Sequence, residues 1–297
     1  MKIEKVEVFG VAVPLVGEFK NAYLSKTVVK SAIVRITASG GAVGLGNIDP
    51  TPGYSKENTE DHLRVLRDQL APLLIGMDPT NVHRVLQRIE PAVPGFLDSK
   101  AAIEMACIDL AARVAGMPVY TYLGGAVKDE LLFNAWIGIL TPEQAAKETL
   151  EWKQKGFRSA KIKVGGNIEA DRDRIEAIRE AVGPEFHLRI DANAGYDADT
   201  SIKLANMVAP YKLQLFEQPV PADDIAGMAR VRRAANAVGL SIMADESVLD
   251  HASLIRIIRA DAADIVKVKV MKQGGFLNTR RMIATAEAAG IRCVVGH

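Results

Sequence analysis

The stretch Lys161-Ile162-Lys163-Val164-Gly165-Gly166 decides how the second half of the chain is expected to fold. Side chains along a β-strand alternate between its two faces, so Lys161 and Lys163 lie on one face of a short apolar strand. Two glycines then break the strand, and residues 167–181 have the pattern of a helix. The stretch therefore predicts a strand that presents two lysines on one face and leads into a helix.

Four later strands are predicted to end in the same way, with a charged residue. The five charged strand ends are Lys163, Asp191, Glu217, Asp245 and Lys269, separated by 28, 26, 28 and 24 residues. One strand, one helix and two loops occupy about that length. In a (β/α) barrel the carboxyl ends of the parallel strands meet on one face, and catalytic residues are found there. The spacing therefore indicates a barrel with a charged catalytic face.

Strands and helices alternate from Leu131 onward. The strands are predicted around Trp136, Ile162, Leu188, Leu215, Ile242, Val266 and Val294, and the helices from Pro142, Asn167, Asp197, Ala222, Leu249 and Gly275. This alternation predicts an α/β fold, a parallel TIM-like (β/α) barrel over residues 126–297. Seven strands are one fewer than in a standard barrel and would leave an open edge. We therefore expect the barrel to be incomplete at its C-terminus, with an eighth strand in the natural protein.

Residues 1–125 are expected to form an α+β capping domain, a three-stranded meander followed by helices. The strands are predicted at residues 3–13, 28–37 and 43–45, with polar loops at 17–27 and 47–55. The helices are predicted at residues 57–74, 80–89 and 100–115, with Asp98 or Ser99 as the N-cap of the third.

The composition excludes several classes of protein. A formal net charge of +1 over 297 residues gives no reason to expect nucleic acid as a partner. The two cysteines, Cys107 and Cys293, lie in apolar settings and do not suggest a disulfide framework or a thiolate metal site. The charged N-terminus is unlike a signal peptide, and no apolar run approaches the roughly 20 residues of a membrane span. We expect a cytoplasmic protein that does not interact with membranes.

Asp191, Glu217 and Asp245 are predicted to converge at the tips of three adjacent strands. Unpaired carboxylates so close together would repel one another, and a divalent cation removes that repulsion. Ligation by oxygen alone favours Mg²⁺, with Mn²⁺ as a substitute, over zinc. The alternative is structural, in which the three carboxylates cap the following helices or pair with surface lysines.

Lys163 and Lys269 are predicted to face each other across this metal site. A nearby cation or second ammonium group lowers the pKa of a lysine toward the range of a useful base, and Lys161 supplies such a charge. Two bases on opposite sides of a bound carboxylate suit removal of the proton α to it, with the metal stabilising the enediolate. The alternative is that Lys161 and Lys163 only fill a polar layer of the barrel with salt bridges.

Three further residues lie near the predicted site. Asn193 is two residues beyond Asp191 and either orients a ligand or caps the next helix. Glu246, next to Asp245, is expected to point elsewhere, toward the lysines. His297, at the end of the seventh strand, is a further candidate acid/base.

These residues resemble the enolase superfamily, and more closely the muconate lactonizing enzyme subgroup of the mandelate racemase/muconate lactonizing enzyme family. The resemblance covers nearly the whole chain. In the barrel it is carried by Lys161-Ile-Lys163, Asp191-Ala-Asn193, Glu217-Gln-Pro219, Ala244-Asp-Glu-Ser247 and Lys269-Val-Met-Lys-Gln-Gly-Gly275, and in the cap by residues 71–81, 109–115 and 118–125.

The resemblance implies a (β/α)7β barrel in the full protein, Mg²⁺ on Asp191, Glu217 and Asp245, and Lys163 and Lys269 as the acid/base pair. It also implies a homo-oligomer, and a cap whose loops choose the substrate through residues such as Phe19, Tyr23, Asp49 and Tyr54. The expected enzyme is an isomerase that acts on a small carboxylate, either a muconate-type cycloisomerase or a racemase/epimerase. A dehydratase that uses the same enediolate chemistry is the alternative, and an inactive barrel used for binding is a third possibility.

Overall fold

The computed structural model describes residues 1–20, 25–51 and 55–296, and the chain divides into two compact units. The first unit consists of Met1–Gly17, Thr27–Leu131 and Lys269–Arg281. The second consists of Glu18–Lys26, Leu132–Val268 and Met282–His297. The predicted division of the chain at residue 125 stays a prediction.

The first unit contains most of a three-stranded sheet in the order β1 (Ile3–Lys20), β2 (Ser25–Ala38) and β3 (Val43–Ile48); the last residues of β1 and the first of β2 are assigned to the second unit. β2 and β3 pair antiparallel, with Val34 opposite Gly46. The prediction of a loop over residues 17–27 was wrong at both ends, because β1 continues to Lys20 and β2 already begins at Ser25. Polar and glycine-containing sequence does not by itself end a strand, since strand preference depends strongly on context.

The helices of this unit follow the sheet in sequence. They are α1 (Thr59–Val65), the π-helical turn η1 (Leu66–Leu70), α2 (Ala71–Leu74), α3 (Val82–Ile89), α4 (Leu97–Val114) and α5 (Val119–Tyr122). The prediction that Asp98 or Ser99 caps α4 was wrong: the cap residue is Phe96, and no side chain caps the helix. Both predicted side chains have tertiary partners instead, because Asp98 accepts a hydrogen bond from Ser55 and Ser99 bonds to His62.

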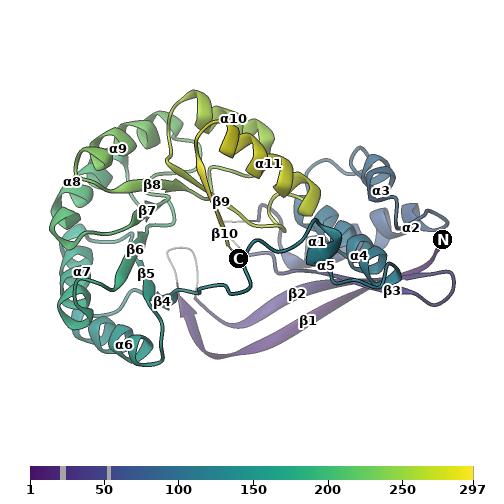
Figure 1. The fold of residues 1–297 in the computed structure, drawn as a ribbon, viewed down its shortest axis with the longest axis horizontal. Helices are drawn as coiled ribbons and strands as arrows, with labels where there is room; N and C mark the ends of the chain where they lie inside the picture. The colour runs from purple at the N-terminus through teal and green to yellow at the C-terminus, as the bar shows by residue number, and fades with distance from the viewer. Residues whose placement is uncertain (21–24, 52–54, 297) are drawn as a thin grey trace. The chain divides into compact units, whose positions relative to one another are not determined.

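The second unit is built on a seven-stranded sheet in which every neighbouring pair is parallel. Its strands are β4 (Ala135–Ile137), β5 (Ser159–Lys163), β6 (His187–Asp191), β7 (Leu215–Glu217), β8 (Ser241–Ala244), β9 (Ile265–Val268) and β10 (Arg292–Val295). They stand side by side in chain order and form a curled, TIM-like sheet (Figure 1). Each of the seven predicted strand centres lies within one of these strands.

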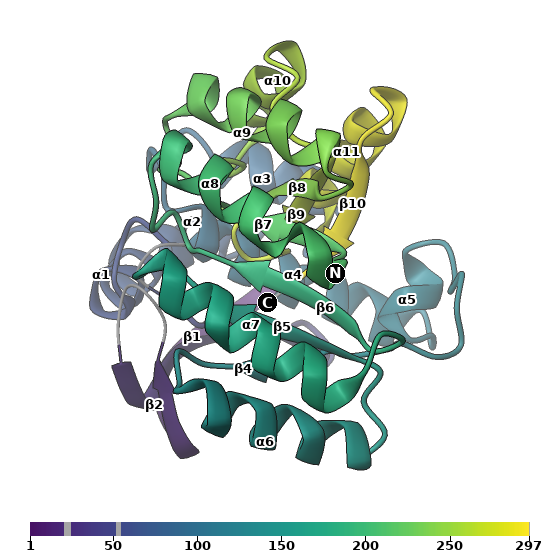
Figure 2. The ribbon, with the colours of Figure 1, turned by 90° about the vertical axis from the view of Figure 1, so that its left-hand side faces the viewer.

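Helices follow the strands and cover one face of the sheet. They are α6 (Pro142–Gln154), α7 (Ile168–Val182), α8 (Ala198–Val208) with the 3₁₀ turn η2 (Ala209–Tyr211), α9 (Ile225–Ala237), α10 (His251–Arg259) and α11 (Phe276–Ala288). Figure 2 shows α6, α7, α8 and α9 stacked in chain order in front of the strands. Side chains cap the N-termini of three of them: Asn167 caps α7, Asp197 caps α8 and Asp224 caps α9. These caps bind the free backbone N–H groups of the first helical turn and so fix where each helix begins after its loop.

The core of the second unit lies between its sheet and its helices. Alternate strand residues point into this core and are fully buried, among them Ile162, Ile190, Phe216 and Ile242. The other residues of the same strands point to the opposite face, where Leu215, Met243 and Ile265 form a small apolar cluster with Val294. Period-two alternation therefore separates a packed apolar face from the face that carries the charged residues.

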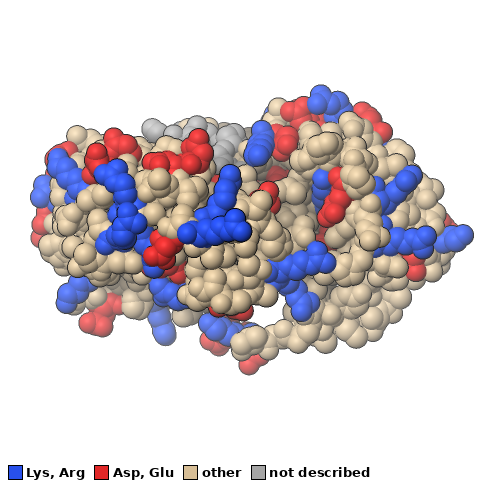
Figure 3. All heavy atoms as spheres, turned by 90° about the horizontal axis from the view of Figure 1, so that it is seen from above, with Lys and Arg blue, Asp and Glu red and all other residues tan. Residues whose placement is uncertain are grey.

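On the face of the protein seen in Figure 3, basic and acidic side chains are interspersed. This agrees with the formal net charge of +1. Among the described residues, no helix is both long and apolar enough to cross a membrane.

Candidate active site

The charged strand ends of the second unit lie side by side on its sheet. Lys163 is the last residue of β5, Asp191 of β6 and Glu217 of β7, while Asp245 directly follows β8. In the strand register, Asp191 pairs with Lys163 on one side and with Glu217 on the other. All four side chains are buried. The cluster is therefore a set of ionisable groups removed from water at one end of the sheet.

Lys163 is almost completely enclosed, with 2% of its surface exposed. Its ammonium group donates to Asp191 Oδ2 at 2.6 Å and to Asn193 Oδ1 at 2.5 Å. Burial lowers the pKa of Lys163 below its ordinary value, and the neighbouring Lys161 lowers it further, although Asp191 opposes both. A lysine with a lowered pKa is a better general base at neutral pH than a free one.

Two further lysines bind the same carboxylates. Lys161 Nζ lies 2.8 Å from Asp191 Oδ2 and 3.5 Å from Glu217 Oε1. Lys267 Nζ, from β9, lies 2.6 Å from Glu217 Oε1 and 3.9 Å from Asp245 Oδ2. The carboxylates thus pair with lysines, as the structural alternative predicted, but these lysines are buried or nearly so and do not lie on the surface.

Asp191 stays ionised in spite of its burial. Complete burial acts to raise its pKa, but the charges of Lys161, Lys163 and Lys267 outweigh that effect and hold the pKa of Asp191 well below its ordinary value. A permanently charged carboxylate at this position is suited to bind a cation and to stabilise the protonated form of a neighbouring lysine.

Asn193 connects the lysines to a fourth carboxylate. Its backbone N–H donates to Asp191 Oδ1 at 3.0 Å, its Oδ1 accepts from Lys163, and its Nδ2 donates to Glu246 Oε1 at 3.0 Å. The alternative that Asn193 caps a helix is wrong, because Asp197 is the N-cap of α8. Glu246 reaches the lysines through this amide, and Asn193 orients the Lys163 ammonium group.

The remaining predicted residues are placed as follows. Lys269 directly follows β9, is buried, and its backbone N–H donates to Gln273 Oε1 at 2.5 Å. In the first unit, the backbone N–H of Asp49 lies 3.3 Å from Met271 Sδ. The side chain of Phe19 and the whole of Tyr23, Tyr54 and His297 lie outside what the structure describes.

The donor set at the strand ends has the chemistry that a hard divalent cation requires. It consists of carboxylate oxygens, and Glu217 Oε2 is buried without a hydrogen-bond partner among the described residues. However, in the described part of the chain no three His, Cys, Asp or Glu side chains are already arranged as a metal-binding group. The three lysines account for this, because they hold oxygens of Asp191 and Glu217. The residues fit Mg²⁺ on the condition that some of these ion pairs rearrange.

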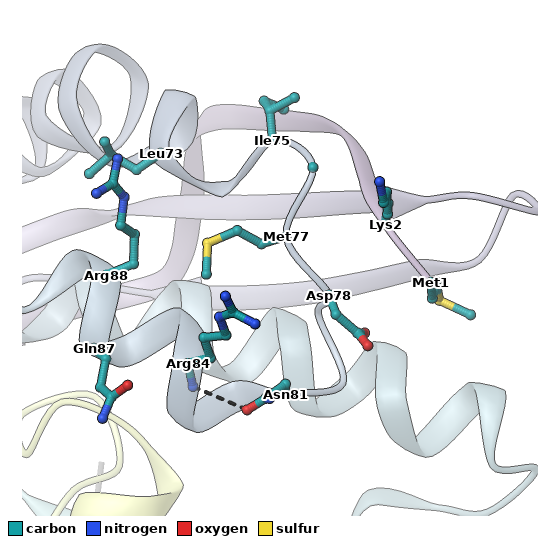
Figure 4. Close-up of a pocket in the computed structure, with 11 residues that line it drawn as sticks. Met1, Lys2, Leu73, Ile75, Met77, Asp78, Asn81, Arg84, Gln87 and Arg88 are labelled. Atoms are coloured by element: carbon teal, nitrogen blue, oxygen red, sulfur yellow. Dashed lines mark hydrogen bonds between the residues drawn. The ribbon is translucent and has the colours of Figure 1, made fainter.

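Two hollows elsewhere on the protein do not include the predicted site residues. One, of about 870 Å³, belongs to the first unit and is lined by Lys2, Asp78, Arg84, Arg88 and their neighbours (Figure 4). The other, of about 280 Å³, lies near the beginnings of β8 and β10 and is lined by Ser241 and Arg292 among others. The second is therefore at the end of the sheet opposite to the charged cluster.

The sequence matches two family patterns that together span most of the chain. Residues 3–124 match the mandelate racemase/muconate lactonizing enzyme N-terminal domain, and residues 144–297 match the enolase C-terminal domain-like pattern. The chain belongs to the mandelate racemase/muconate lactonizing enzyme family. The family predicted from the strand-end motifs is thereby confirmed.

Three relatives of this family member are isomerases. An L-Ala-D/L-Glu epimerase of Bacillus subtilis is 36% identical over all of this chain and 81% of its own length. An N-succinyl-L-Arg/Lys racemase of Bacillus cereus is 33% identical, with 100% and 80% covered. Muconate cycloisomerase 1 of Rhodococcus opacus is 31% identical, with 99% and 79% covered. Epimerases, racemases and cycloisomerases are all isomerases, as the sequence predicted.

Solved structures show that the family member has the family fold. The N-succinyl Arg/Lys racemase from Bacillus cereus superposes with a TM-score of 0.96 at 33% identity, covering 100% of this chain and 80% of that one. A dipeptide epimerase from Enterococcus faecalis, complexed with Mg and the dipeptide L-Leu-L-Tyr, superposes with a TM-score of 0.95 at 33% identity, covering 100% and 82%. The TIM-like barrel prediction is confirmed.

Two residues that shape the site in this family member were missed by the sequence analysis. One is Lys267, whose position two residues before Lys269 repeats the spacing of Lys161 and Lys163 and signals the same strand face. The other is Gln218, which is fully buried. Its Oε1 accepts from the backbone N–H groups of Asp245 and Ser247, at 3.0 and 3.1 Å. No sequence periodicity marks such a residue, because its role arises only when two strand ends come together.

Proposed function

We propose that this protein is a Mg²⁺-dependent racemase or epimerase that removes the proton α to the carboxylate of a small amino-acid derivative. The observation that carries the proposal is the enclosed Lys163, with a lowered pKa, hydrogen-bonded beside buried carboxylates at the strand ends. Three relatives support the substrate class, since they are an L-Ala-D/L-Glu epimerase, an N-succinyl-L-Arg/Lys racemase and a hydrophobic dipeptide epimerase.

In this proposal Lys163 is the base on one side of the substrate. Loss of its proton to solvent is favoured by burial and by the charge of Lys161, which disfavour the ammonium form. Asn193 Oδ1 and Asp191 Oδ2 fix the direction of the Lys163 amine through the bonds of 2.5 and 2.6 Å. A lysine held in this way takes the α-proton without first having to find its orientation.

Lys269 is proposed as the acid/base on the opposite side. It directly follows β9 and lies two residues beyond Lys267, so strand alternation directs both side chains to the same face. Racemisation requires that one lysine removes the α-proton and that another returns a proton to the opposite side of the same carbon. A pair of lysines on separate strands supplies those two positions.

Asp191, Glu217 and Asp245 are proposed as the residues that hold Mg²⁺, with Mn²⁺ as a substitute. When bound, the metal ion would stabilise the negative charge that the substrate carboxylate gains as the α-proton leaves. Lys161 remains beside Asp191 and Glu217 in this arrangement and adds a second positive charge. Each 1.36 kcal/mol of stabilisation of that anion is about tenfold in rate.

The test is exchange of the substrate α-hydrogen in D₂O, followed by proton NMR. The panel contains dipeptides, N-succinyl and other N-acyl amino acids, muconates and sugar acids, each with added MgCl₂. We expect exchange and inversion with a dipeptide or an N-acyl amino acid. Lactone formation from a muconate would instead identify a cycloisomerase, as in the Rhodococcus relative. Loss of water from a hydroxy acid would identify a dehydratase, and no exchange with any compound would contradict the proposal.

Three further features belong to the same proposal. The capping residues 1–125 choose the substrate, in part through the loops that contain Phe19, Tyr23, Asp49 and Tyr54. The protein acts in the cytoplasm as a homo-oligomer. Replacing Asp49 by Ala should change the relative KM values of the panel compounds more than their kcat values.

The oligomeric state is measured by light scattering after size-exclusion chromatography.

A further inference from the structure

We propose that Lys267 is a counter-ion within the metal site. Its ion pair with Glu217 must break before Mg²⁺ can bind, and this lowers the affinity of the site for the metal. This inference rests on the proposed function, because it assumes that Glu217 and Asp245 are metal ligands. It concerns a residue that the reaction described above does not use.

Lys267 is held by the carboxylates at the centre of the cluster. Its ammonium group lies 2.6 Å from Glu217 Oε1, the shorter of the two ion pairs that Glu217 forms with lysines. Asp245 Oδ2 is 3.9 Å from the same ammonium group. The side chain is only 9% exposed, so water screens this pair poorly. Lys267 therefore lies within ion-pair distance of two of the carboxylates that are proposed to hold the metal ion.

The protein makes room for this lysine at a specific place. Gly296 directly follows β10, and its N–H donates to Val268 O at 2.8 Å, so the backbone there is fixed beside β9. A Cβ added at Gly296 would lie 2.3 Å from Lys267 Cε. A glycine at this position thus leaves space for the lysine stem, which indicates that the packing around β9 and β10 accommodates the extended side chain.

The charges explain what Lys267 does without metal and with it. Lys161 and Lys163 lie within ion-pair distance of Asp191, and Lys267 lies within ion-pair distance of Glu217 and Asp245. In the metal-free protein these ion pairs offset part of the cost of burying the carboxylates. A divalent cation would add two charges beside an ammonium group that is already present, so the lysine opposes its binding. The ion pairs that stabilise the site without metal therefore weaken its complex with Mg²⁺.

The experiment is calorimetric titration of the intact chain with MgCl₂ at fixed pH and salt, without substrate. Lys267→Gln keeps a hydrogen-bond donor near Glu217 but removes the charge, and Lys267→Met removes both. We expect the dissociation constant for Mg²⁺ to fall by about tenfold or more in both variants. We also expect the metal-free variants to melt at a lower temperature than the metal-free wild type. Saturating Mg²⁺ should raise their melting temperatures by more than it raises that of the wild type. If Lys267→Met does not fold, Lys267→Gln decides alone.

The matched control is Lys203→Gln, which causes the same change in net charge at an exposed pair with Glu169. Its Mg²⁺ affinity should equal that of the wild type. Unchanged or weaker Mg²⁺ binding by both Lys267 variants would overturn the inference and leave the proposed function standing. Binding by Lys267→Gln with none by the wild type would support it. Absence of Mg²⁺ binding in every variant would remove the metal site, and with it the proposed function.

Discussion

At the scale of single residues, the site depends on which partner each charged group finds. Lys163 and Lys161 lie two residues apart on one strand, yet one is enclosed by Asp191 and Asn193 while the other spans Asp191 and Glu217. The same residue type on the same strand face therefore serves two purposes. In the proposed reaction, the enclosed Lys163 is the base, and the more exposed Lys161 is suited to contact an anion.

We predict that Lys163→Met lowers the rate of racemisation in both directions by about 100-fold or more. Because Lys269 remains, exchange of the α-hydrogen should persist for the one enantiomer whose proton faces Lys269. The measurement is NMR exchange in D₂O, started separately from each enantiomer, with Lys203→Met as a surface control. Equal loss of exchange from both enantiomers would contradict the two-base arrangement, and undiminished turnover would exclude Lys163 from the reaction.

The strand-end charges were predictable from the sequence because they recur at the length of one strand and one helix. Their partners were not. Asn193 adopts a left-handed backbone with a φ of 45°, and nothing in the sequence indicates that its amide joins Lys163 to Glu246. Lys267 carried the same signal as Lys161, but its pairing with Glu217 depends on the register of two strands that are not neighbours.

At the scale of elements, the helices and strands of the barrel were easier to predict than those of the first unit. In the barrel, an apolar strand is followed by a polar cap and an amphipathic helix, so three local signals agree at each boundary. Around residues 17–27 the only signal was polarity, and the strands continued through much of it. At α4, Asp98 and Ser99 have the residue types of caps, but tertiary hydrogen bonds engage both.

The packing of β3 against α4 gives a prediction at this scale. A Cβ added at Gly46 would lie 1.8 Å from the backbone oxygen of Ala102, so the strand and the helix would have to separate. We predict that Gly46→Ala lowers the free energy of unfolding by about 2 to 3 kcal/mol. At Gly17, where an added Cβ meets nothing within 4 Å, the same substitution should change it by less than about 0.5 kcal/mol. Urea titration followed by circular dichroism measures both, and equal effects would contradict the close approach.

At the scale of the whole molecule, a buried acid in the first unit makes stability depend on pH. Burial raises the pKa of Glu104 to about 7, although the backbone N–H groups of Leu277 and Phe276 donate to its carboxylate and act in the opposite direction. In the unfolded chain the same group ionises near its ordinary value of 4.5. Stability from this group is therefore complete below about pH 4.5 and is lost as the pH rises to about 7.

We predict that Glu104→Gln removes this pH dependence. Relative to the wild type, the variant should gain about 3 kcal/mol in its free energy of unfolding between pH 4.5 and pH 8, because glutamine does not ionise. The amide also loses one acceptor for the two backbone donors, but that loss is the same at both pH values. Urea unfolding at the two pH values measures the change, and the exposed Glu180→Gln serves as the control. A constant difference between Glu104→Gln and the wild type would show that folding does not raise the pKa of Glu104.

The buried amide of Gln218 has a consequence for how the site can respond. By accepting from the N–H groups of Asp245 and Ser247, it fastens the tip of β7 to the tip of β8. We therefore expect the backbones at Glu217 and Asp245 to move together. A substitution on one of the two strands alone should not reposition either carboxylate. With Glu217 and Asp245 as the proposed metal ligands, adapting the site to a cation of another size would require paired replacements on both strands, or the loss of the amide that couples them.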